Sequence, residues 1–132
     1  MLVEFDQYVY VSEMIYCLKC LINNGYIPIV AHVERYYALH NAIQWVSVLR
    51  KIGCLFQVNA YSFVGERNEK IKKFAKTLLR EKYISFIGSD AHKTNHRPYA
   101  IQSGINYIHR KCDAQYAEDI CYRNAERILN IK

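Results

Sequence analysis

The sequence has no long hydrophobic run. No segment approaches the roughly 20 consecutive apolar residues that a membrane-spanning helix requires. Its first residues, MLVEFDQY, contain two acids and no basic cluster, so they do not resemble a secretory signal peptide. No low-complexity linker divides the 132 residues, and 52% of them are hydrophobic, which is enough to bury a core. We therefore expect one domain, without membrane insertion, that is cytoplasmic.

The five cysteines do not follow the pattern of a secreted disulfide scaffold. Their number is odd, and they are scattered over segments of helical or strand character: Cys17, Cys20, Cys54, Cys112 and Cys121. Reduced thiols in a cytoplasmic protein are the simpler interpretation. Cys17 and Cys20 form a C-x-x-C motif within an apolar helical stripe, and no second pair completes a zinc site. We therefore expect both to be thiols of the hydrophobic core.

The formal net charge is +6, and its densest source lies between residues 70 and 82. Basic residues alternate there with apolar ones such as Ile71, Phe74 and Leu78. This pattern is typical of an amphipathic helix with a solvated basic face, so we expect no nucleic-acid partner. A basic surface would also suit an anionic phosphorylated partner.

Four short apolar runs rich in branched and aromatic residues recur along the chain: residues 2–5, 27–31, 55–59 and 83–88. Such runs are typical of buried parallel strands. The segments between them have helical periodicity, and Asn24-Gly25 and Gly53 mark the ends of the first two. A short helix from Pro98 and a helical region over residues 113–129 follow the fourth run. The pattern predicts an α/β fold in which crossover helices connect parallel strands.

Four strand and helix units are about half of a closed eight-unit barrel, which usually needs roughly 250 residues. The sequence thus predicts a partial barrel or an open sheet. Either arrangement leaves strand edges and apolar faces uncovered. We therefore expect the chain either to dimerise or to be poorly stable alone.

Acidic and imidazole side chains follow three of the four predicted strands. Glu4 ends the first run, His32 follows the second, and Asp90 and His92 follow the fourth. Because ligands gather at the carboxyl ends of parallel strands, we expect these four side chains to converge on one face. Carboxylate and imidazole together, without cysteine, suit divalent ions such as Mn²⁺, Zn²⁺ or Fe²⁺.

Two arginines follow these residues closely. Arg35 and Arg97 carry guanidinium groups, which match a pair of phosphate oxygens better than any other side chain. Metal ligands and arginines together indicate phosphate ester chemistry. Simpler interpretations remain open: Glu4 as an ordinary strand-edge acid, His32 as a core histidine, and Glu34 as an ion-pair partner of Arg35. His40, His96 and His109 are assigned to the surface or to packing, because none lies at a strand end.

Four segments then resemble one known family. Residues 27–36 (IPIVAHVERY), 55–65 (LFQVNAYSFVG) and 86–98 (FIGSDAHKTNHRP) are similar to its three motifs, and 124–130 (NAERILN) to its last helix. The family comprises the bacterial manganese-dependent protein-tyrosine phosphatases of the polymerase-and-histidinol-phosphatase (PHP) superfamily, of the CpsB/CapC type. These are encoded with genes for capsule and exopolysaccharide synthesis.

The resemblance implies a distorted barrel related to the TIM fold and a set of site residues. By position, Glu4, His32, Asp90 and His92 match metal ligands, with Mn²⁺ as the cofactor. Arg35 and Arg97 match the arginines that hold the phosphate. The implied partner is a phosphotyrosine protein substrate, a tyrosine kinase of capsule synthesis.

The sequence departs from the family pattern in three places. Val33 replaces a proline, Tyr61 stands where a small residue is usual, and no strand carries the His-x-His that begins the family. We therefore expect residues 1–132 to be the C-terminal part of a PHP phosphatase domain, with the activity of the isolated chain in doubt. The alternatives are a catalytically inactive truncated remnant or interaction module, and a small-molecule phosphatase such as histidinol-phosphate phosphatase.

Overall fold

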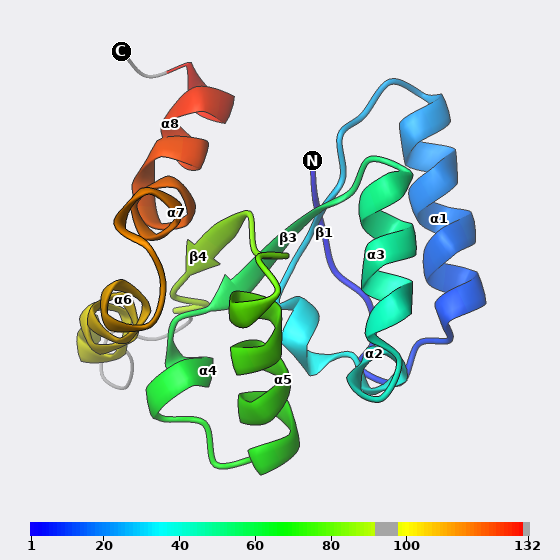
Figure 1. Ribbon diagram of the computed structural model, residues 1–132. Coiled ribbons are helices and arrows are strands. Elements are labelled where there is room, and N and C mark those ends of the chain that lie inside the picture. Colours follow the sequence, from blue (N-terminus) through cyan, green and yellow to red (C-terminus); the bar gives the residue numbers. More distant parts are fainter. Residues whose placement is uncertain (92–97, 131–132) are drawn as a thin grey trace.

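The computed structural model describes residues 1–91 and 98–130, which form an α/β fold around a four-stranded sheet (Figure 1). The strands lie in sequence order, and all three pairings are parallel. Their bounds are β1 Leu2–Val3, β2 Ile29–Val30, β3 Leu55–Asn59 and β4 Phe86–Gly88. The predicted parallel α/β architecture is confirmed, although three of the strands are shorter than the apolar runs that predicted them.

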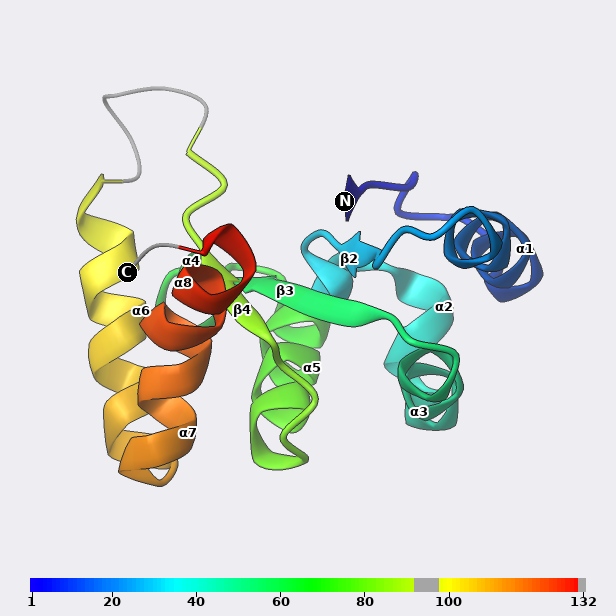
Figure 2. The ribbon, with the colours of Figure 1, turned by 90° about the horizontal axis from the view of Figure 1, so that it is seen from above.

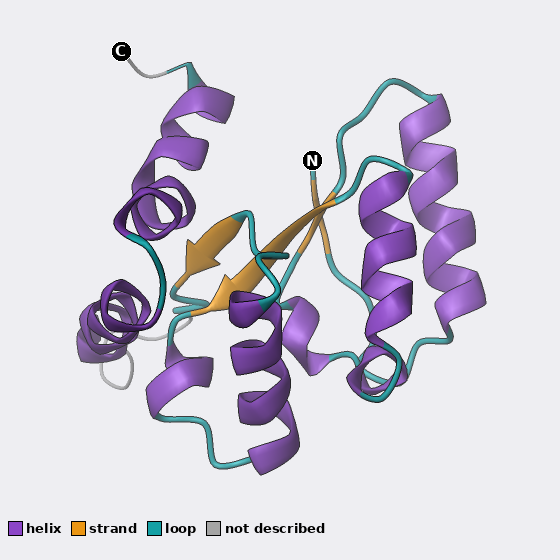
Figure 3. Ribbon diagram, viewed as in Figure 1, coloured by secondary structure: helices purple, strands orange, loops and turns teal. Residues whose placement is uncertain are grey.

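Helices connect each strand to the next (Figure 3). Before β4 they are α1 Val11–Asn23, the 3₁₀ turn η1 Val33–Arg35, α2 Tyr37–His40, α3 Ile43–Lys51, α4 Tyr61–Val64 and α5 Glu69–Arg80. After β4 they are α6 Pro98–Lys111, α7 Ala114–Glu118, the π-helical turn η2 Asp119–Arg123 and α8 Asn124–Leu129. Figure 2 shows α3 and α5 on the same side of the sheet, as expected when parallel strands are joined by crossovers of one hand.

The side of the sheet that faces these helices forms the hydrophobic core. Val30 of β2 and Phe56 and Val58 of β3 are fully buried there, whereas Leu55 and Gln57, which alternate with Phe56 and Val58 along β3, are only partly buried. One face of the sheet is therefore packed, and the other face is free to carry polar side chains.

Helix α5 shows most directly how local sequence produces the packing. Its N-cap residue Asn68 accepts hydrogen bonds through Oδ1 from the backbone amides of Lys70 (3.0 Å) and Ile71 (3.4 Å). Its buried residues recur with helical period: Ile71, Phe74, Ala75, Leu78 and Leu79. The lysines occupy the outer face, so the predicted solvated basic face is confirmed.

Glycines end two of the helices as the sequence predicted. Gly25 has φ 83° and Gly53 has φ 108°, the left-handed region in which a side chain would be strained. Gly104 of α6 has a different role, because a Cβ atom there would lie 2.4 Å from the carbonyl oxygen of Ala60. The absence of a side chain at Gly104 allows α6 to pack closely against the start of α4.

The prediction for the C-x-x-C motif is wrong. Cys17 and Cys20 are exposed, because α1 buries only the side that carries Met14 and Leu18. The apolar stripe of α1 is therefore wider than the part of it that other described residues cover. All five cysteines are free thiols, and burial raises the pKa of Cys54 to about 11. Across the described residues, no helix has the length and apolar character that crossing a membrane would require.

Candidate metal and phosphate site

The ends of β1 and β2 bring Glu4 and His32 together. Val3 pairs with Val30, so the residues that follow each strand lie side by side. His32 Nε2 lies 3.1 Å from Glu4 Oε1. The His32 side chain is only 11% exposed, whereas that of Glu4 is 72% exposed. The pair therefore joins a buried imidazole to a carboxylate that is open to solvent.

A chain of hydrogen bonds extends from His32 across the sheet. The backbone amide of His32 donates to Gln57 Oε1 (2.7 Å), and Gln57 Nε2 donates to Asn59 Oδ1 (2.9 Å). Asn59 Nδ2 in turn donates to Asp90 Oδ2 (3.3 Å), beyond the end of β4. Gln57 and Asn59 thus connect the strand ends that carry His32 and Asp90. Neither amide was predicted as a site residue, although polar residues two apart on a buried strand indicate one polar face.

Arg35 adds a guanidinium group to this edge of the sheet. It is the last residue of η1, and its Nη1 lies 3.3 Å from Asp90 Oδ2. Both side chains are partly buried, at 29% exposure for Arg35 and 15% for Asp90. The guanidinium therefore reaches from the end of β2 to the end of β4, across the intervening β3.

Glu34 does not pair with Arg35, which corrects one interpretation of the sequence. Its carboxylate is fully buried, and Oε1 accepts hydrogen bonds from Ser62 Oγ (2.7 Å) and the backbone amide of Asn59 (3.0 Å). Burial raises the pKa of Glu34 to about 7, although these two hydrogen bonds act in the opposite direction. The role of Glu34 is to hold η1, which carries Arg35, against β3 and α4.

Two of the candidate residues have unusual backbone conformations. His32 has φ 32° and Asp90 has φ 49°, the left-handed region that non-glycine residues seldom adopt. Such conformations cost about 1–3 kcal/mol each and concentrate at functional sites. Their occurrence at two strand ends on the same edge of the sheet supports a functional assignment for this edge.

The donor set fits a divalent ion in chemical type but is incomplete in number. Among residues 1–91 and 98–130, no group of three His, Cys, Asp or Glu side chains is close enough to hold a metal. Within the same ranges, His32 Nδ1 is a buried polar atom without a hydrogen-bond partner, which is compatible with a ligand role. Predicted ligand His92 and predicted phosphate contact Arg97 lie outside the described residues.

Two of the three remaining histidines, His40 and His109, behave as the sequence indicated. His40 packs between Tyr37 and Phe74, with ring centroids 5.1 and 4.9 Å away. His109 is exposed on α6. His96 lies outside the described part of the chain.

The fold and this edge define a class of protein: a parallel α/β protein that gathers carboxylate, imidazole and guanidinium groups at the carboxyl ends of its strands. The sequence model of one family covers residues 1–130, and the chain belongs to that family, described as capsular polysaccharide synthesis, CpsB/CapC.

Individual relatives agree with this membership. The chain is 30% identical to the tyrosine-protein phosphatase CpsB of Streptococcus pneumoniae, over 97% of this chain and 55% of that protein. It is 32% identical to the putative tyrosine-protein phosphatase CapC of Staphylococcus aureus, over 91% of this chain and 46% of the relative. The chain thus spans about half the length of the curated relatives it matches.

A solved structure shows the same fold. It comes from work on YwqE of Bacillus subtilis and CpsB of Streptococcus pneumoniae, described as unique metal-dependent tyrosine phosphatases. The match has a TM-score of 0.71 at 25% identity and covers 86% of this chain and 46% of the other. The predicted resemblance to the CpsB/CapC type is confirmed.

Proposed function

We propose that this chain is part of a metal-dependent protein-tyrosine phosphatase that acts in the cytoplasm on a tyrosine kinase of capsule synthesis. One observation carries the proposal: a carboxylate–imidazole pair and an arginine–carboxylate pair share one sheet edge, joined by Gln57 and Asn59. The names of the relatives support the reaction and the phosphotyrosine substrate. Five free thiols are compatible with a reducing cytoplasm.

In this proposal, Glu4, His32, Asp90 and His92 hold Mn²⁺, with Zn²⁺ or Fe²⁺ as alternatives of similar ligand preference. When bound, such ions supply Lewis-acid activation of water and neutralise charge on the phosphoryl group. Arg35 and Arg97 bind the phosphoryl oxygens through paired N–H donors. Asp90 orients the Arg35 guanidinium, and the Gln57–Asn59 pair sets the spacing between the two halves of the edge.

We further propose that residues 1–132 correspond to the C-terminal part of a PHP phosphatase domain. The share of the relatives that the chain covers supports this, as does the incomplete ligand set among the described residues. The complementary part of the domain would supply the other ligands. It would also cover exposed apolar residues near β1 and α1, such as Leu2 (66% exposed) and Ile27 (61%), unless a second copy of the chain does so.

The rival hypothesis is a catalytically inactive remnant or interaction module. It is favoured by the lack of a three-ligand group in residues 1–91 and 98–130. A small-molecule phosphatase of the histidinol-phosphate type has no comparable support, because the relatives are named as tyrosine-protein phosphatases.

The test combines metal binding with turnover. Calorimetric titration of the 132-residue chain with Mn²⁺ should show weak binding, and hydrolysis of a phosphotyrosine peptide should be low. Joined to the N-terminal half of the Streptococcus pneumoniae relative, the same chain should bind Mn²⁺ more tightly and hydrolyse the peptide. If the joined protein binds metal and folds but hydrolyses no aryl phosphate, the remnant hypothesis is correct. Light scattering of the chain at several concentrations tests association with a second copy.

A further inference from the structure

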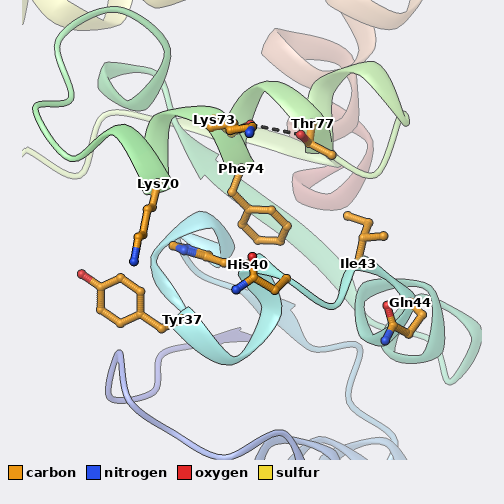
Figure 4. Close-up of a pocket in the computed structure, with 9 residues that line it drawn as sticks. Tyr37, His40, Ile43, Gln44, Lys70, Lys73, Phe74 and Thr77 are labelled. Atoms are coloured by element: carbon orange, nitrogen blue, oxygen red, sulfur yellow. Dashed lines mark hydrogen bonds between the residues drawn. The ribbon is translucent and has the colours of Figure 1, made fainter.

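A cavity of about 660 Å³ lies between α5 and the α2–α3 segment, and none of its lining residues belongs to the strand-edge site (Figure 4). Its size falls within the range of about 300–1,000 Å³ that is usual for small-molecule sites. Figure 4 shows Lys70 and Phe74 of α5 opposite Tyr37 and His40 of α2, with Ile43 of α3 to the right of Phe74.

The charge of the cavity wall is entirely positive. Lys70 and Lys73 contribute ammonium groups, and none of the nine lining residues is acidic. Neither lysine forms an ion pair with any residue in the described ranges. Lys72, on the same helix but outside the cavity, has Glu69 as a partner at 4.0 Å. The cavity is therefore bordered by two exposed lysines without an acidic partner in the described ranges, which favours an anionic ligand.

The rest of the wall is apolar or able to donate hydrogen bonds. His40, Tyr37 and Phe74 form a row of rings. His40 Nε2 donates to the carbonyl oxygen of Glu34 (2.7 Å), which holds the ring in place. The Tyr37 hydroxyl accepts a hydrogen bond from Asn68 Nδ2 (3.2 Å), so its own proton remains available for a ligand. Ile43, which is partly exposed, offers an apolar surface for a ligand body, whereas Phe74 lines the cavity but is only 4% exposed.

We propose that this cavity is a second binding site, separate from the strand-edge site, for a small organic phosphate. The phosphate dianion would lie against Lys70 and Lys73, and an apolar or ring-shaped body against Phe74 and Ile43. The charge of the dianion matches that of the two lysines, which a neutral or cationic ligand would leave uncompensated. None of the residues that line the cavity is a proposed metal ligand.

Phenylphosphonate is a suitable probe, because its carbon–phosphorus bond resists a phosphatase. In ¹⁵N NMR titrations of the chain without divalent metal, it should shift the amide resonances of Tyr37, His40, Lys70, Lys73 and Phe74. Inorganic phosphate, which lacks the ring, and benzyl alcohol, which lacks the charge, should each bind more weakly. Substitution of both Lys70→Gln and Lys73→Gln should weaken phenylphosphonate binding by about tenfold or more, because two ion pairs are lost.

Lys72→Gln is the matched control, since this lysine lies on the same helix outside the cavity. The affinity of this variant for phenylphosphonate should stay within about twofold of wild type. Arg35→Gln should leave the cavity shifts unchanged, which separates this proposal from the proposed phosphatase function. The proposal is overturned if benzyl alcohol binds as tightly as phenylphosphonate. It is also overturned if the cavity amides do not shift, or if Lys72→Gln weakens binding as much as the double substitution.

Discussion

Arg35 Nη1 lies 3.3 Å from Asp90 Oδ2, although the two residues follow strands β2 and β4, which are not neighbours in the sheet. Asn59, at the end of the intervening β3, donates to the same carboxylate oxygen. A partly exposed ion pair contributes little to stability, typically about 0–1 kcal/mol. Its importance is geometric, because Asp90 holds the guanidinium at the edge where the proposed substrate phosphate would bind.

Arg35→Gln should separate phosphate binding from metal binding. In a protein completed with the rest of the domain, we expect phosphotyrosine hydrolysis to fall by about 100-fold or more, since a charged donor to the phosphoryl oxygens is lost. Metal content, measured by elemental analysis, should not change, because a guanidinium cannot ligate a cation. Arg50→Gln is the control, since Arg50 donates to the Lys82 carbonyl away from this edge. Equal activity of Arg35→Gln and wild type would contradict the role of Arg35.

His32→Ala should abolish calorimetric Mn²⁺ binding, because it removes the imidazole that lies beside Glu4. His109→Ala removes an exposed imidazole on α6 and should bind Mn²⁺ as wild type does. If His32→Ala retains the affinity of wild type, His32 is a core histidine and not a ligand.

Glu34 should make the protein less stable as the pH rises. Its pKa is raised from 4.5 to about 7 in the folded state, so the folded protein binds more protons than the unfolded chain between these values. Ionisation of this group should therefore lower the free energy of unfolding as the pH rises from 4.5 through about 7, by about 3 kcal/mol in total. Glu34→Gln, which keeps an oxygen acceptor for Ser62 and Asn59, should lack this decrease.

Urea denaturation at pH 5 and pH 8 measures this effect. The stability of Glu34→Gln relative to wild type should improve at the higher pH. Glu69→Gln, at a side chain that is 84% exposed, should show no such change. A pH-independent difference between Glu34→Gln and wild type would mean that Glu34 is ionised throughout this range.

Two glycine-to-alanine substitutions should lower the stability of the fold by different amounts. In Gly104→Ala, the new Cβ would lie 2.4 Å from the Ala60 backbone oxygen, so α6 or α4 must move, and stability should fall by about 1–3 kcal/mol. In Gly88→Ala, the new Cβ would lie 2.5 Å from Nε2 of Gln57, so this side chain must rotate and give up its hydrogen bond to Asn59, but none of the three nearest atoms belongs to the backbone. Thermal unfolding should therefore show a smaller loss of stability for Gly88→Ala, and a larger loss than in Gly104→Ala would contradict the close packing of α6 against α4.

The pKa of His40 should respond to Lys70. Burial lowers the pKa of His40 below 6.5, and the positive charge of Lys70 lowers it further. Lys70→Gln should therefore raise the pKa, measured from the imidazole resonances by NMR, but leave it below 6.5, because burial is the larger cause. Lys72→Gln should have a smaller effect. An unchanged value in Lys70→Gln would show that Lys70 does not lie against this ring.

The sequence by itself determined the order of strands and helices and the identity of the residues at the strand ends. Period-two and helical patterns depend on neighbours close in the chain, so α5 and the ends of the helices at Gly25 and Gly53 were predictable. The assignment of Glu4, His32 and Asp90 to one edge followed from the same local order, because parallel strands end on the same side of a sheet.

Tertiary structure alone decided which of these groups contact one another. The burial of Glu34, its bond to Ser62 and the connection of His32 to Asp90 through Gln57 depend on strand register and side-chain direction. The exposure of Cys17 also depends on tertiary structure, because helical periodicity defines an apolar face but not which neighbour covers that face. Burial and charge pairing are properties of long-range contacts, and a local pattern does not specify them.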